Sequence, residues 1–139
     1  MQDYNIKNKT KLKDRTYQYS IKMIEFLDNL PKDTSTQIIS KQLLRSATSI
    51  GANIIEAQAS SSKKDFTKFF NYSLKSANES VYWLSLLKDA KKINNYQIEY
   101  LLNETKELAN ILGSSILTLK GKNKFWILNY GFSLFALRF

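Results

Sequence analysis

Hydrophobic residues recur at intervals of three and four along most of the chain, the spacing that lines one face of an α-helix. The clearest stretch is residues 35–59. Its apolar positions are Ile39, Leu43, Ala47, Ile50 and Ile54. Similar patterns predict three further helices, over residues 14–29, 63–91 and 96–120. Four long helices joined by short loops predict an all-α fold, an antiparallel up-down-up-down four-helix bundle.

Polar residues mark the expected helix ends. Thr34 and Gln37 have the spacing of a capping box, which predicts the start of the second helix. Ser62 and Asp65 predict an N-cap for the third helix, with an acid in the first turn where the helix dipole favours it. Lys120–Gly121 suits a helix C-terminus.

Composition divides the chain into three parts. Residues 1–13 are polar and rich in lysine, and we expect a frayed, flexible basic arm. Residues 14–121 hold the predicted bundle. Residues 122–139 form an aromatic-rich tail, whose apolar part is too short for a membrane-spanning helix of about 20 residues. The tail docks on the bundle, binds a partner, touches a membrane surface or is a non-native or poorly ordered extension; the sequence leaves these alternatives open.

Two features predict contacts beyond a single bundle. The first helix has one apolar row at Tyr19, Met23, Phe26 and Leu30 and a second row at Tyr17, Ile21 and Ile24. A helix that is apolar on two sides must be covered on more than one side, which favours a homo-oligomer. In the second helix small residues surround Gly51. Because glycine inside an exposed helix costs about 1 kcal/mol relative to alanine, we expect close packing there.

The absence of cysteine and histidine narrows the possible chemistry. Disulfides and thiolate metal sites are excluded, and the commonest general base and nitrogen ligand are missing. We therefore predict no enzyme, with no catalytic residue, metal, cofactor or small-molecule substrate. The polar N-terminus shows no signal peptide, so we expect a cytoplasmic protein without a membrane span.

Four polar residues of the second and third helices are expected to face inward as a structural network: Arg45, Asn53, Glu56 and Glu79. A buried charge is costly unless it is paired, and an ion pair of Arg45 with Glu79 or Glu56 would meet that cost. The alternative is a metal or catalytic site made by Glu56, Glu79 and Glu104. Di-metal carboxylate bundles normally add histidines, which this chain lacks.

A net charge of +9 and a pI near 9.6 favour an anionic partner. The residues predicted to contact RNA or DNA phosphates are Lys63, Lys64, Lys68, Lys91 and Lys92. Lys63 and Lys64 open a helix, where positive charge opposes the dipole, so helix stability does not explain their position. The alternative is that the lysines only keep the protein soluble.

The second helix resembles the signature helix of the 23S rRNA intervening-sequence protein family, which are four-helix bundles. The matching residues are Gln42-Leu43, Arg45, Ala47, Ser49-Ile50, Ala52-Asn53-Ile54 and Glu56. The third-helix pattern of the family is matched by Ser62-Lys63-Lys64-Asp65-Phe66, Phe69, Ser76 and Glu79. The likeness covers roughly residues 14–120. Gly51 departs from the family, which often has proline there, and so does Ala57, where glycine is usual.

The resemblance implies a small cytoplasmic bacterial protein without established enzyme activity, assembled as a ring of five bundles. It is also similar to the accessory protein of diversity-generating retroelements, a basic barrel that works with a reverse transcriptase and nucleic acid. The leading hypothesis is a homopentamer that binds RNA or DNA with little sequence specificity. The alternative is a protein-interaction scaffold or accessory subunit without direct nucleic-acid binding.

Overall fold

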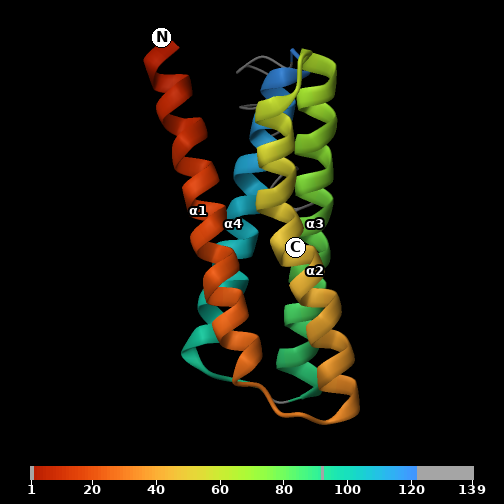
Figure 1. Ribbon diagram of the computed structural model, residues 1–139. Coiled ribbons are helices and arrows are strands. Elements are labelled where there is room, and N and C mark those ends of the chain that lie inside the picture. Colours follow the sequence, from red (N-terminus) through yellow and green to blue (C-terminus); the bar gives the residue numbers. More distant parts are fainter. Residues whose placement is uncertain (1, 92, 122–139) are drawn as a thin grey trace, which may run out of the picture.

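The computed structural model in Figure 1 describes residues 2–91 and 93–121, with side chains from residue 11 onward. Its helices are α1 (Gln2–Asp28), α2 (Thr34–Ala59), α3 (Lys63–Ala90) and α4 (Tyr96–Leu119). No strand occurs in these residues, so the predicted all-α class is confirmed. The α1–α2 and α3–α4 connections lie at one end of the molecule, and the α2–α3 connection lies at the other (Figure 1).

The helix boundaries follow the predictions except at two starts. α1 begins at Gln2, well before the expected start near Asp14, so the backbone of residues 2–13 is helical. α2 is capped by Asp33, whose side chain accepts from the Thr36 backbone N–H, and not by Thr34 as the capping box predicted. The division into arm, bundle and tail stays a prediction, and residues 122–139 lie outside the described part.

The predicted Ser62 cap is observed, and α4 has a cap of the same kind. The Ser62 side chain accepts from the Asp65 N–H at the start of α3, and Asn95 does the same for Ile98 at the start of α4. These side chains satisfy backbone donors that the first turn of a helix leaves without partners. Gly121 follows the end of α4 with a φ of 74°, a left-handed conformation that glycine adopts without strain.

One apolar row from each helix meets in a continuous core. For α1 this row is the predicted one at Tyr19, Met23 and Phe26, and it continues to Leu30 just after the helix. The second predicted row of α1 remains at the surface, where Tyr17 is 66% exposed and Ile24 is 44% exposed. The remaining core residues include Leu43, Ala47, Ile50, Ile54, Leu84, Leu87, Leu101, Leu108 and Leu112.

The buried polar side chains of the core carry hydroxyls, and four of them, one from each helix, form two pairs. Tyr19 of α1 and Thr105 of α4 share a hydrogen bond of 2.7 Å, and Ser46 of α2 and Ser80 of α3 share one of 2.8 Å. Thr105 also donates to the Leu101 carbonyl, which satisfies it within its own helix. Hydroxyls are tolerated here because each finds a partner without a net charge.

Two further contacts attach α1 to its neighbouring helices. A Cβ added to Gly51 would lie 3.1 Å from Oγ1 of Thr16, so glycine permits the close approach of α1 and α2, as the sequence predicted. Arg15 forms two hydrogen bonds with Glu104 of α4, at 2.6 and 2.9 Å, and an ion pair with Glu107. The Glu104 hydrogen bond is the main reason why the pKa of Arg15 is raised. Towards its N-terminus α1 diverges from the other helices (Figure 1).

Candidate nucleic-acid interface

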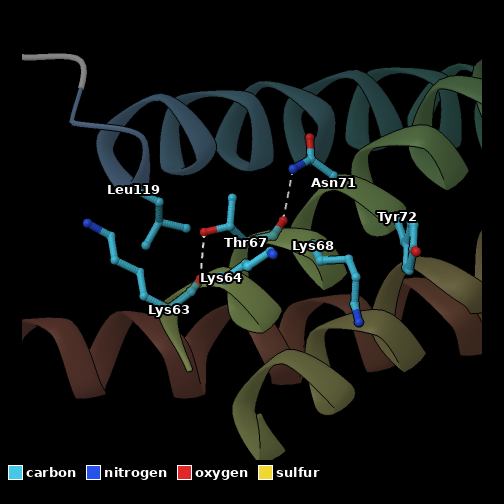
Figure 2. A pocket seen from close by; sticks show the side chains of 7 residues that line it. All are labelled: Lys63, Lys64, Thr67, Lys68, Asn71, Tyr72 and Leu119. Atoms are coloured by element: carbon cyan, nitrogen blue, oxygen red, sulfur yellow. Dashed lines mark hydrogen bonds between the residues drawn. The ribbon is translucent and has the colours of Figure 1, made fainter. Parts of the chain in front are cut away.

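Three of the five predicted lysines line one open groove, which has a volume of about 530 Å³. Lys63, Lys64 and Lys68 come from the first turns of α3, and Leu119 reaches the groove from the end of α4. The groove is completed by Thr67, Asn71 and Tyr72. Figure 2 shows Leu119 beside Lys63 at one end of this set and Tyr72 at the other. We call it the lysine groove.

The lysine groove is positively charged because its carboxylate neighbours are few. Asp65 lies 3.4 Å from the Lys68 amine, three residues away on the same helix, and both side chains are about half exposed. The other polar wall residues bond along α3: Thr67 donates to the Lys63 carbonyl and Asn71 donates to the Thr67 carbonyl (Figure 2). These hydrogen bonds fix the wall, while the side chains of Lys63 and Lys64 are exposed.

A fourth lysine lies on the same face of α3, and the sequence analysis did not single it out. Lys75 follows Lys64 by eleven residues and Lys68 by seven, which places the three on one helical row. Its side chain is exposed. The signal was present in the helical spacing, but Lys75 stands alone in the sequence and not in a run of lysines. The lysine-bearing face is therefore longer than the lysine run at residues 63–64.

The other two predicted lysines do not belong to this groove. Lys91 follows the end of α3, about 40 Å from Lys63 at 1.5 Å per residue. Its amine bonds to Asp33 at 2.7 Å. Lys91, and to a smaller extent Thr36, hold the pKa of Asp33 below its ordinary value. The side chain of Lys92 lies outside the described residues. The four described lysines of this set are therefore divided between the two ends of α3.

The predicted inward-facing polar network lies at the surface of the single chain. Arg45 and Glu79 form the expected ion pair between α2 and α3, but their side chains are 58% and 34% exposed. Trp83 also donates to Glu79, at 3.2 Å. Asn53 donates to the Ser49 carbonyl, and Glu56 is exposed. The interior holds the buried hydroxyls described above instead, because a hydroxyl costs less to bury than a charge.

The glutamates that the alternative hypothesis brought together do not meet. Glu104 forms an ion pair with Arg15, and Glu79 forms one with Arg45. Within the described residues no group of three or more acidic side chains is placed to hold a metal ion. The same part of the chain contains no helix long and apolar enough to cross a membrane.

A second groove lies between α1 and α2, with a volume of about 460 Å³. Its floor includes Gly51 and Ala52, and its walls include Tyr17 and Ile55. Tyr17 and Ile55 are 66% and 43% exposed, so the groove presents apolar surface to solvent. We call it the α1–α2 groove. Lys13 and Asp14 also line it, and their opposite charges leave no excess positive charge for a polyanion, so its exposed apolar side chains suit a protein surface better.

Comparisons with known proteins agree with this fold. The sequence model of the family described as 23S rRNA-intervening sequence protein matches residues 8–114. A crystal structure of a protein with unknown function from the S23 ribosomal protein family of Bacteroides thetaiotaomicron is similar, with 37% identity and a TM-score of 0.71. That alignment covers 78% of this chain and 96% of the other. A search of curated proteins gave no match. Because the family match spans most of the four helices, this chain belongs to the 23S rRNA-intervening sequence protein family.

Proposed function

We propose that this protein is a non-enzymatic, homo-oligomeric bundle that binds the phosphates of RNA or DNA with little sequence specificity. The observation that carries the proposal is the lysine groove, in which Lys63, Lys64 and Lys68 line one surface and Asp65 forms an ion pair with Lys68. Their position at the start of α3 opposes the helix dipole, so it is better explained by a ligand than by stability. The protein acts without a cofactor or small-molecule substrate.

Several lysines on one face provide affinity without sequence readout. Lysine is a flexible point charge that contacts phosphates, whereas base recognition needs side chains placed against base edges. Binding then releases counterions, so affinity falls steeply with salt. The net charge of +9 adds a long-range attraction that speeds encounter with a polyanion.

The oligomer in this proposal is a cyclic homopentamer of antiparallel up-down-up-down bundles, located in the bacterial cytoplasm. The α1–α2 groove supports it, because Tyr17, Ile24 and Ile55 leave apolar surface that a second copy of the chain covers. In a closed ring every copy offers the same groove, so each contact is satisfied. The ring also gathers the lysine grooves of all subunits into one assembly.

The same apolar groove favours a second candidate function. In this alternative the protein is an interaction scaffold or accessory subunit, for example for a reverse transcriptase, and the α1–α2 groove binds a partner protein. Affinity for that partner depends little on salt, because the groove buries apolar surface instead of pairing charges. A salt series therefore separates the two functions.

The test is a binding titration of the full chain with structured RNA and with duplex DNA at 50 and 200 mM salt, together with the mass in solution. We expect an oligomer whose affinity falls between the two salt concentrations. Lys63→Gln with Lys64→Gln should lower affinity for both ligands and flatten the plot of log affinity against log salt by roughly 1.8 for duplex DNA, about 0.9 per lost phosphate contact.

The matched control is Lys32→Gln with Lys41→Gln, which removes the same charge from exposed positions outside the groove. We expect this control to bind almost as well as the natural chain. Equal losses in the two double variants would show that net charge alone attracts the ligand. An oligomer that ignores both ligands at 50 mM salt would overturn the nucleic-acid proposal and leave the scaffold.

A further inference from the structure

An exposed aromatic ring lies inside the lysine groove. Tyr72 is 44% exposed and follows Lys68 by one helical turn. Its ring packs against the Phe69 ring with 5.9 Å between the centroids and with the two planes nearly at right angles. Phe69 is half-buried against the core, and the Lys68 amine lies 5.0 Å from its ring centroid. Tyr72 therefore packs against the half-buried Phe69 while its own side chain remains exposed to solvent.

We propose that the lysine groove takes a single strand of nucleic acid, with an unpaired base stacked on Tyr72 and the phosphates held by Lys63, Lys64 and Lys68. This inference rests on the proposed function and names the class of ligand at that site. The tyrosine ring offers a planar apolar surface beside several positive charges. Proteins that bind single strands combine these two features, because every base has a flat face and every nucleotide has a phosphate.

The geometry favours a single strand over a duplex. In a duplex the base faces are covered by their neighbours, so a ring on the protein surface can reach only phosphates, sugars and groove edges. In a single strand a base can turn out to meet a ring. Lys64, Lys68 and Tyr72 lie at successive turns of α3, so phosphates and one base of the same strand meet the same run of helix.

The sequence beyond the groove has the same character. Leu119 lines the groove at the end of α4, and Lys122, Lys124, Phe125 and Trp126 follow it within seven residues. Basic and aromatic residues thus follow a groove-lining residue closely in the sequence. For this reason the experiment uses the full chain.

The experiment compares the binding of a fluorescent 20-nucleotide single strand, as RNA and as DNA, with the binding of a duplex of the same length. We expect Tyr72→Ala to weaken single-strand binding about tenfold and to leave duplex binding within about twofold. Tyr72→Phe should bind single strands as well as the natural chain, because the ring and not the hydroxyl is responsible. Helicity and melting temperature verify that each variant folds.

Tyr96→Ala is the matched control, since Tyr96 is 83% exposed at the start of α4 and lies outside the lysine groove. It should bind both ligands normally. Equal affinity for single strand and duplex, with no effect of Tyr72→Ala but a clear effect of Lys63→Gln with Lys64→Gln, would overturn this inference and keep the proposed function. Absence of binding to either ligand would instead overturn both.

Discussion

The two grooves of this bundle differ in what they present to solvent. The lysine groove carries three exposed lysines and one exposed ring, whereas the α1–α2 groove presents Tyr17 and Ile55 above small residues. Both are shallow surfaces between neighbouring helices, and neither holds a cluster of catalytic groups. One helical scaffold thus has a charged surface and an apolar surface in different places, and we propose a different binding partner for each. Variants confined to one groove should therefore leave the other unchanged.

The largest expected effect comes from placing charge in the α1–α2 groove. Tyr17→Lys with Ile55→Lys should convert the proposed oligomer into single chains, because an unpaired charge in an apolar interface costs several kcal/mol and every 1.4 kcal/mol is tenfold in association. Light scattering after gel filtration measures the mass. Both side chains are exposed in the single chain, so we expect normal helicity. Tyr96→Lys is the control, and an unchanged mass in the double variant would show that the groove is not the subunit interface.

The next effect comes from filling the contact at which α1 and α2 meet. Gly51→Leu forces its Cβ against Thr16 at 3.1 Å and should lower the free energy of unfolding by roughly 1–3 kcal/mol. Urea unfolding followed by circular dichroism measures it. Ala59→Leu, at an exposed position of α2 outside both grooves, should change stability by less than about 0.5 kcal/mol. If both variants were equally stable, α1 would not be held by this close approach.

A smaller loss is expected when α1 is released from α4. Arg15→Gln removes the ion pairs with Glu104 and Glu107 and should cost about 1–2 kcal/mol, since Glu104 is only 12% exposed and loses its partner. Arg45→Gln, in the more exposed pair with Glu79, should cost less than about 0.5 kcal/mol. Equal losses would contradict the ranking by burial. Single-strand binding in the lysine groove should survive both changes.

Tyr19→Phe tests one of the buried hydroxyl pairs of the core, because it removes the hydroxyl that bonds to Thr105. It should cost about 1 kcal/mol at neutral pH, because Thr105 keeps its hydrogen bond to the Leu101 carbonyl. Burial raises the pKa of Tyr19 above its ordinary value of 10.0. The stability linked to this raised pKa is complete below pH 10 and is lost as the pH rises through the folded value. The free energy of unfolding, measured from pH 7 to 11, should therefore fall less at alkaline pH in the variant than in the natural chain. An equal fall in both proteins would contradict this account.

The smallest effect is expected far from both grooves, at the Asp33 cap. Its pKa is lowered by Lys91 and Thr36 from an ordinary 3.8, so its stabilisation is present above that value and is lost as the pH falls through the lower folded pKa. Asp33→Asn keeps a capping side chain but removes the charge. The variant should melt slightly below the natural chain at pH 7, and the gap should close towards pH 2. A constant gap would show that the charge plays no part.

Local signals in the sequence predicted much of the fold. The Ser62 cap, the core row at Leu43, Ala47, Ile50 and Ile54 and the close packing at Gly51 are all observed. The cap and the core row can be predicted from the spacing of residues within one helix. The close packing can be predicted because glycine is unfavourable inside an exposed helix. The same reasoning predicted the Arg45–Glu79 pair. It chose the wrong cap for α2, because Asp33 and Thr34 are adjacent and both residue types cap helices.

The site was predicted only in part, because the sequence does not give distances between helices. Lys63, Lys64 and Lys68 were identified from their lysine run, but Tyr72 was not linked to them and Lys91 was added although it lies at the opposite end of α3. The partners of Arg15 and Tyr19 on α4 are 86 or more residues away in the sequence. Neither contact leaves a local pattern.

The sequence by itself determined the four helices, the buried face of three of them and the charge available for a partner, because helical periodicity and composition are local properties of the chain. The tertiary structure alone decided which of two apolar rows of α1 is buried, which polar groups occupy the core and which lysines share a surface with an exposed ring. Those choices depend on how helices distant in sequence pack together, where burying a charge costs far more than burying a hydroxyl that has a partner.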